Sequence, residues 1–368
     1  MRWLRLRPLL LTALVLDFIL LFLLMLSIKY PESLEEIYTR GVFAWYAKCA
    51  GWLSDRIPFS IHEAIGIALA LALVVAVSRG CKNFLTKKAT LSKLILKGAE
   101  RLFIALSIFA FLFYLLWGLN YFRPRLIDSA QFDAGLVTTD RATYLSEKCL
   151  LVLQALENVS PVPDRDLPLF MQSAISHAMP MIGDRPLATS VRVKYFLGGW
   201  LSALPSTGVT LPLLPENHIS LDLFDFEKPF IIAHEKAHLQ GRALESEANF
   251  LALLACLSAE QPWIRRSGVF FLFRMLLRSL PPKQRLLYLS RIPHAAWHDF
   301  KAPALRMANK SPFIVALFQM FYGNFLKAQR IQDGLANYSA ATQLALGYRF
   351  RNGKPLDIDT IGRIIKED

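Results

Sequence analysis

The sequence predicts an α-rich α+β fold, in which three N-terminal transmembrane helices precede a mostly helical extracytoplasmic domain with a small sheet. Hydrophobic residues make up 54% of the 368 residues, more than is usual in soluble proteins, and the excess lies before residue 123. Most of the remaining chain has a helical pattern, and only short segments alternate as strands do. The chain therefore divides into a membrane anchor, residues 1–123, and a globular domain, residues 124–368.

Three apolar segments are long enough to cross a bilayer as helices. A helix rises 1.5 Å per residue, so roughly 20 apolar residues cross the hydrocarbon core. The predicted spans are residues 8–28, 57–78 and 102–121. We interpret the first as a retained signal anchor, because its apolar run is longer than that of a signal peptide. Asp17, inside this span, is expected to make a polar contact with another span.

The distribution of Lys and Arg predicts the topology. Residues 79–101 carry seven basic side chains against one acidic one, whereas residues 29–56 carry four of each sign. Basic segments remain in the cytoplasm, so we expect a cytoplasmic N-terminus, a multi-pass protein of the cytoplasmic membrane, and an extracytoplasmic C-terminal domain. The net charge of +13 needs no nucleic-acid partner, since part of it is anchor charge and no nucleic-acid-binding signature is present. The lipid bilayer is the expected partner.

The first half of the globular domain mixes helix and strand patterns. Residues 138–159 have the pattern of an amphipathic helix with a Thr or Asp cap at its start. Residues 189–196 and 216–223 alternate as strands do, and the turn-rich stretch between them, residues 198–215, predicts a further short strand.

The second half, after Lys228, has a helical pattern interrupted by prolines. Two apolar runs lie within it, at residues 268–277 and 312–326. Both are too short to span a membrane comfortably, so we expect them to be buried or membrane-facing helices of the domain.

One short motif predicts metal chemistry. The segment His234–His238 reads "HEKAH", an HExxH pattern. Residues four apart share one helical face, so both imidazoles can meet one metal ion, and Glu235 lies beside that face, where it can act as a general base. Gly241 is the expected end of the helix. The alternative is a solvated helix end where these side chains only cap or pair, but the apolar opposite side favours a buried helix.

A catalytic zinc site needs a third protein ligand and one open position, and Glu245 and Glu247 are the candidates. Residues 245–249, "ESEAN", resemble the ExxA[D/N] helix of gluzincin peptidases, which favours Glu245 and implies that Asn249 hydrogen-bonds behind the ligands. Glu247 points about 200° away on an ideal helix and remains the alternative. The spacing after His238 is shorter than in most gluzincins. The pattern is not that of a metzincin, because Leu244 occupies the position of the third ligand.

Zincins also carry an edge strand before the active helix, which pairs with an extended substrate. The segment 216–223, "ENHISLDL", is in the corresponding place. Glu216, Asn217 or His218 could therefore line a substrate cleft. Each could equally be an ordinary exposed strand residue.

The chain resembles an uncharacterised bacterial family of three-span membrane proteins with a zincin-like HExxH outer domain, known only as a domain of unknown function. The likeness covers the three spans, "LPLLPENHIS", "HEKAHLQGRALESEANFLALLAC" and the motif Phe321–Leu346. It implies a zincin-like fold and a metallopeptidase-like site at His234, Glu235 and His238. The C-terminal motif has no assigned chemical role and includes Lys327, Gln329, Gly334 and Tyr338.

These patterns together predict a membrane-anchored, Zn²⁺-dependent metallopeptidase-type hydrolase that acts on proteins or peptides at the outer face of the cytoplasmic membrane. One alternative is a catalytically inactive zincin-like protein that binds a partner. Another is a membrane scaffold without metal.

Overall fold

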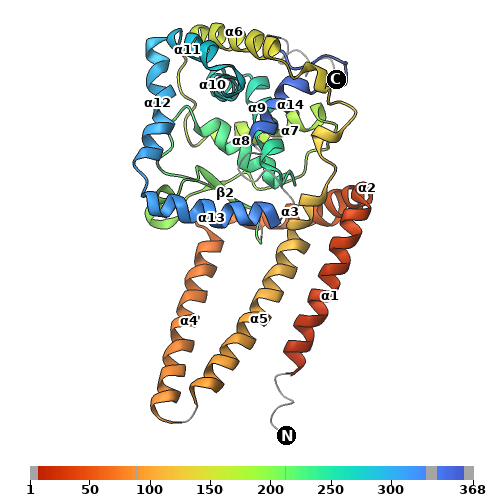
Figure 1. Ribbon diagram of the computed structural model, residues 1–368, viewed down its shortest axis with the longest axis vertical. Helices are drawn as coiled ribbons and strands as arrows, with labels where there is room; N and C mark the ends of the chain where they lie inside the picture. Colours follow the sequence, from red (N-terminus) through yellow and green to blue (C-terminus); the bar gives the residue numbers. More distant parts are fainter. Residues whose placement is uncertain (1–6, 88–89, 212, 329–337, 360–368) are drawn as a thin grey trace. The chain divides into compact units, whose positions relative to one another are not determined.

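The computed structural model describes residues 7–87, 90–211, 213–328 and 338–359, which form mostly α-helices and one small sheet (Figure 1). The chain forms two compact units. The first comprises residues 1–46, 60–123 and 212–214, and the second residues 47–59, 124–211 and 215–368. Residues 47–59 lie within the predicted anchor, but their contacts place them in the second unit.

The first unit holds three helices that are long and apolar enough to cross a membrane, so the chain is a membrane protein by length and composition. They are α1 (Arg7–Lys29), α4 (Ile61–Leu85) and α5 (Leu91–Leu116). Helix α5 begins eleven residues before the predicted third span, residues 102–121, and ends at Leu116, before that span does. Residues 91–101 are rich in Leu and Lys, which are good helix formers, so the helix begins before the apolar run.

Polar contacts join the helices of the first unit. Ser107 Oγ donates a hydrogen bond to Asp17 Oδ2 at 2.9 Å, which confirms the expected contact between spans. The buried Arg123 guanidinium donates two hydrogen bonds to the Glu35 carboxylate, from Nε to Oε2 at 2.5 Å and from Nη2 to Oε1 at 2.8 Å. The connecting elements of this part of the chain are α2 (Pro31–Leu34), the π-helix η1 (Glu35–Phe43), α3 (Ala44–Arg56) and the 3₁₀-helix η2 (Gly118–Phe122).

A single central helix organises the second unit. In α9 (Glu245–Ser258), every residue from Ser246 to Leu257 is buried. A helix that is covered on all sides lies in the core of a domain. Its neighbours are α7 (Leu167–Met181), α8 (Lys228–Leu239), α10 (Pro262–Ser279) and α14 (Tyr338–Gly347) (Figure 1).

Further helices surround this core. Thr138 Oγ1 accepts a hydrogen bond from Arg141 N at 3.2 Å, which confirms the predicted cap of α6. The remaining helices are α6 (Thr139–Ala155), α11 (Pro282–Ser290), α12 (His294–Ala308), α13 (Pro312–Ala328) and the 3₁₀-helices η3 (Leu126–Asp128), η4 (Ala134–Leu136) and η5 (Leu197–Ala203).

The sheet has the order β1-β3-β2, with β3 parallel to β1 and antiparallel to β2. Its strands are β1 (Val193–Lys194), β2 (Gly208–Leu211) and β3 (Glu216–Ile219), which are shorter than the alternating segments predict. The prediction that β3 is an edge strand is wrong. Strand β3 lies between the other two strands, Glu216 forms an ion pair with Lys194 on β1, and all four residues of β3 are buried.

The two late apolar runs differ in burial. Residues 268–277 lie in α10 and are mostly covered, whereas residues 312–326 lie in α13, which keeps one apolar side exposed. In the C-terminal motif, Lys327 is exposed at the end of α13. Gln329, Gly334 and the side chain of Tyr338 lie outside the described residues.

Substitutions in the buried Lys194–Glu216 pair test whether the stability of the sheet depends on neutralisation of the Glu216 charge. Lys194→Met leaves a carboxylate buried without its cation and should cost about 3–5 kcal/mol, because desolvation is then uncompensated. The double variant Lys194→Met/Glu216→Leu should recover most of that loss. Thermal unfolding of the full chain in detergent, followed by circular dichroism, measures both, and a single variant as stable as the wild type would contradict this role.

Candidate metal centre

A sharp reversal of the chain brings the two helices of the candidate site together. Helix α8 ends at Leu239, and Gly241, two residues later, has a left-handed φ of 77°, which favours glycine. Arg242 N donates to Ala237 O at 3.1 Å and Gly241 N to His238 O at 3.0 Å. This bond pair is the Schellman ending of a helix. Helix α9 then begins at Glu245, so its first side chain faces α8.

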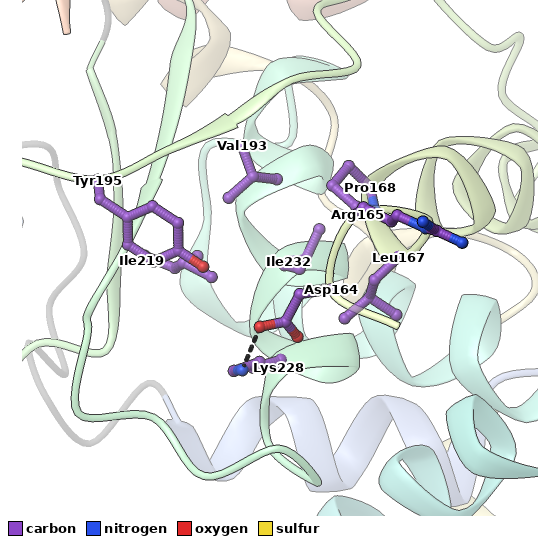
Figure 2. Close-up of a pocket in the computed structure, with 9 residues that line it drawn as sticks. All are labelled: Asp164, Arg165, Leu167, Pro168, Val193, Tyr195, Ile219, Lys228 and Ile232. Carbon is purple, nitrogen blue, oxygen red and sulfur yellow. Dashed lines mark hydrogen bonds and ion pairs between the residues drawn. The ribbon is translucent and has the colours of Figure 1, made fainter. Parts of the chain in front are cut away.

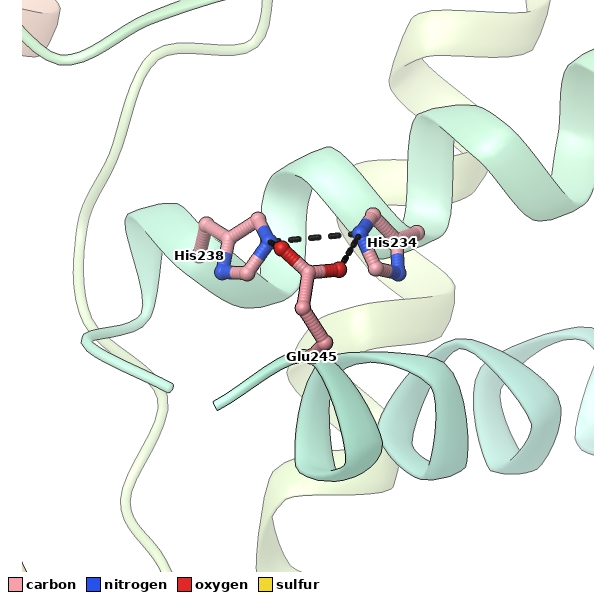
Figure 3. Close-up of side chains that lie close together, drawn as sticks. All are labelled: His234, His238 and Glu245. Atoms are coloured by element: carbon pink, nitrogen blue, oxygen red, sulfur yellow. Dashed lines mark hydrogen bonds and ion pairs between the residues drawn. The ribbon is translucent and has the colours of Figure 1, made fainter. Parts of the chain in front are cut away.

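Three side chains converge in this place (Figure 3). His234 Nε2 lies 3.2 Å from His238 Nε2 and 3.2 Å from Glu245 Oε2, and His238 Nε2 lies 3.7 Å from Glu245 Oε1. Ligand atoms around a tetrahedral zinc ion stand about 3.3 Å apart, given bonds of about 2.0–2.1 Å. The donor set and its spacing therefore fit zinc.

Hydrogen bonding fixes the tautomer of His238. Its Nδ1 lies 2.7 Å from the carbonyl oxygen of Arg242. Because a carbonyl can only accept, Nδ1 carries the proton and Nε2 keeps the lone pair that a metal needs.

Asn249, one turn after Glu245, lies behind the other histidine. Its side chain contributes to raising the pKa of His234. The contact falls short of a hydrogen bond, since Asn249 Nδ2 and His234 Nδ1 are buried without a partner among the described residues. Asn249 therefore lies near His234, and the hydrogen bond that the resemblance to gluzincins implies stays a prediction.

The alternative ligand, Glu247, is occupied elsewhere. Its carboxylate accepts hydrogen bonds from Arg242 Nη1 at 3.0 Å and from the backbone of Leu126 at 2.7 Å. Arg242 also binds Asp184 at 2.5 Å, and all three charged side chains are buried. Glu247 therefore belongs to a structural ion-pair network, and Glu245 is the carboxylate beside the histidines.

The ionisable side chains of the cluster are mostly buried, and their interactions with one another oppose the effect of burial on the pKa of each. Burial opposes ionisation of Glu245, but the hydrogen bond and charge of His234, with the charge of His238, lower its pKa to about 2. Burial lowers the pKa of His238 to about 4. For His234, Glu245 outweighs burial and raises the pKa. The side chains of His234, His238 and Glu245 keep 12%, 9% and 13% exposure, so the cluster is mostly buried but not sealed from solvent.

Glu235 lies against the edge of the sheet. Its Oε2 accepts a hydrogen bond from Thr210 Oγ1 at 2.8 Å, and the same hydroxyl is 3.0 Å from Asn217 Oδ1. A Cβ atom at Gly208 would come within 2.4 Å of Glu235 Oε1, so any larger residue at position 208 would displace the Glu235 carboxyl group. Burial raises the pKa of Glu235 to about 7, which suits a group that exchanges protons at neutral pH.

Lys236, inside the motif, points away from the ligands. It is buried, and its Nζ donates to Gln172 Oε1 at 3.0 Å, Ser190 O at 3.2 Å and Val191 O at 3.1 Å. Asp55 of α3 binds the same turn through Ser190 Oγ at 2.6 Å. Burial lowers the pKa of Lys236 to about 7. This lysine therefore fixes α8 to the chain before β1.

The predicted cleft residues do not line an open cleft. Glu216, Asn217 and His218 are fully buried on the central strand. Glu216 pairs with Lys194, and the His218 ring stacks on Phe196 with centroids 4.1 Å apart. Their part in the site is indirect, through the contact of Asn217 with Thr210.

Tyr322 of α13 is a site residue that the sequence analysis does not predict. Its hydroxyl donates to Glu245 Oε1 at 2.5 Å. The sequence carried one signal, a tyrosine within the apolar run 312–326, but nothing in it indicates that α13 packs against the start of α9.

A separate cavity of about 260 Å³ lies between the start of α8 and the sheet (Figure 2). Tyr195, Ile219 and Ile232 line it, and Lys228 Nζ binds Asp164 Oδ2 at 2.7 Å beside it. On an ideal helix, residues 232 and 234 point about 200° apart, so this cavity opens on the other side of α8 from the histidines.

Comparison with known proteins identifies a family without supplying an activity. No curated protein and no solved structure matches the chain. The family model described as "Protein of unknown function (DUF3810)" matches residues 38–346, well over half of the sequence. The chain therefore belongs to this family, whose function is unknown.

Proposed function

We propose that this protein is a membrane-anchored metallopeptidase-type hydrolase in which His234, His238 and Glu245 hold Zn²⁺. One observation carries the proposal: three donor atoms of His234, His238 and Glu245 stand at the spacing of a zinc ligand set. An HExxH helix alone would be weaker support, because the motif specifies only two of the three ligands.

Each residue of the site would have a separate role. A bound zinc ion supplies Lewis acidity, which acidifies water and polarises a carbonyl group. Glu235, whose pKa burial raises to about 7, accepts a proton from the attacking water and passes it to the leaving amine. Thr210 holds the Glu235 carboxyl, Arg242 orients His238, and Tyr322 orients Glu245.

The substrate is proposed to be a protein or peptide in extended conformation. Strand β2, rather than β3, lies at an edge of the described sheet, and its Gly208 and Thr210 touch Glu235. An exposed edge can add a peptide as a further strand through main-chain hydrogen bonds. The positive-inside distribution of Lys and Arg favours placing this site outside the cytoplasmic membrane.

Metal content tests the ligand set. We expect the full chain, purified without chelator, to hold one zinc ion per molecule, and His234→Ala, His238→Ala and Glu245→Gln each to lose most of it, because two ligands bind zinc weakly. Inductively coupled plasma mass spectrometry measures the ratio. Exposed His298 provides the matched control, since His298→Ala should keep its zinc. Zinc retained by Glu245→Gln but lost by Glu247→Gln would reverse the ligand assignment.

Glu235→Gln separates catalysis from metal binding. The amide keeps the shape of the side chain but cannot accept the proton, so cleavage of a quenched-fluorescent peptide library should fall by about 10²–10⁴-fold while zinc content is unchanged. Equal cleavage by the variant and the wild type would exclude Glu235 as the base. A wild type that holds zinc and cleaves nothing would favour the partner-binding alternative.

Tyr322→Phe tests the support of the metal ligand. Loss of the hydroxyl leaves Glu245 with one hydrogen bond fewer, and zinc affinity should fall by about 10–100-fold, as for other residues that orient ligands. Competition with a chromophoric chelator gives the affinity. Tyr144→Phe, on the exposed side of α6, is the control. Unchanged affinity in Tyr322→Phe would remove Tyr322 from the site.

A further inference from the structure

Helix α13 carries an apolar stripe that no other described part of the chain covers. Its members are Phe313, Leu317, Met320, Phe321 and Phe325, which are 74%, 40%, 52%, 64% and 37% exposed. At 100° per residue they lie within an arc of about 140°. No charged residue falls within this arc. Single exposed apolar residues are ordinary, but a continuous stripe of five indicates a binding surface.

The other side of α13 is fixed to the second unit. Tyr322 binds Glu245, and Leu326 is 1% exposed. Immediately before the helix, Lys310 forms an ion pair with Asp222. These contacts set the rotation of α13 about its own axis, so the stripe is a defined surface.

We propose that this stripe binds the interface of the lipid bilayer, with α13 lying along the membrane surface. The chain's own helices would attach it to a bilayer, since three of them are able to span a membrane. Pro124, where the second unit resumes, follows the end of α5 at Leu116 by eight residues, which cannot extend beyond about 29 Å. The bilayer is therefore always within reach of the second unit.

The dimensions and chemistry of α13 fit an interfacial helix. Its 17 residues extend about 26 Å, short of the roughly 30 Å hydrocarbon core, so it does not span. Phenylalanine, leucine and methionine on a convex helical face bury well among acyl chains. Lys327, exposed at the end of the stripe, can place its ammonium among lipid phosphates.

The position of α13 links this surface to the candidate site. The helix that would rest on lipid also brings Tyr322 to Glu245, so contact with the bilayer would hold the phenol in place. This consequence rests on the proposed function, whereas the lipid contact itself does not. An α13 helix held on the bilayer would favour polypeptides close to the membrane surface as substrates.

Spin labels on the full chain in lipid nanodiscs test the contact. Phe321→Cys and Leu317→Cys would each be labelled with a nitroxide in a background where the two exposed cysteines are replaced, Cys49→Ser and Cys81→Ser. Leu286→Cys is the control, because Leu286 is 67% exposed on α11, on the opposite side of the second unit from α13 (Figure 1). The replaced side chains are exposed, so folding should be retained, and an unchanged unfolding midpoint verifies it.

We expect the ratio of oxygen to nickel-chelate collisions to be several-fold higher at residues 317 and 321 than at 286, because oxygen concentrates in lipid and the chelate in water. Equal, water-like ratios at all three positions would overturn the proposal. It would also be overturned by spin–spin broadening at 321 that disappears on dilution with unlabelled protein, since that result would identify a second copy as the occupant. Zinc content is not part of this measurement, so its failure is distinguishable from failure of the proposed function.

Discussion

The reversal of the chain at Gly241 is the constraint on which the second unit depends. It lets α8 and α9 pack side by side after a connection of only a few residues. The two histidines on α8 then meet the first side chain of α9. Arg242, just after the reversal, acts twice: its carbonyl orients His238, and its guanidinium joins Asp184 to Glu247. A left-handed residue at one position therefore determines both the cluster and the buried network behind it.

The ionisable side chains on and beside α8 each have their own hydrogen-bonding neighbours. Lys236 is surrounded by carbonyl groups, Glu235 is held by a threonine on the edge strand, and Glu245 is shared between the histidines and Tyr322. Burying ionisable groups without partners would be prohibitively unfavourable in this core. The helix that carries the motif can be buried because its polar side chains have separate neighbours on each of its sides.

Local patterns in the sequence predicted much of this arrangement, and tertiary contacts explain the rest. Hydropathy located the three apolar helices, and helical geometry separated Glu245 from Glu247, because an angle of about 200° sends them to different neighbours. Alternation could not show that β3 is central, since a strand covered on both faces and an exposed edge can share one pattern. Tyr322 was not predicted because its partner lies 77 residues away in the sequence. The small-residue requirement at Gly208 likewise arises only when β2 meets Glu235.

The discontinuity of the second unit has a consequence for biogenesis. Residues 47–59 precede α4, yet Asp55 binds the turn at Ser190 and Val191, which is synthesised after α5. If α4 and α5 both cross the membrane, the segment before α4 and the segment after α5 lie on the same face of it. Formation of the Asp55 contacts would then depend on insertion of both helices. A chain that failed to insert one of its two helices would leave Asp55 and its partners on opposite sides of the bilayer.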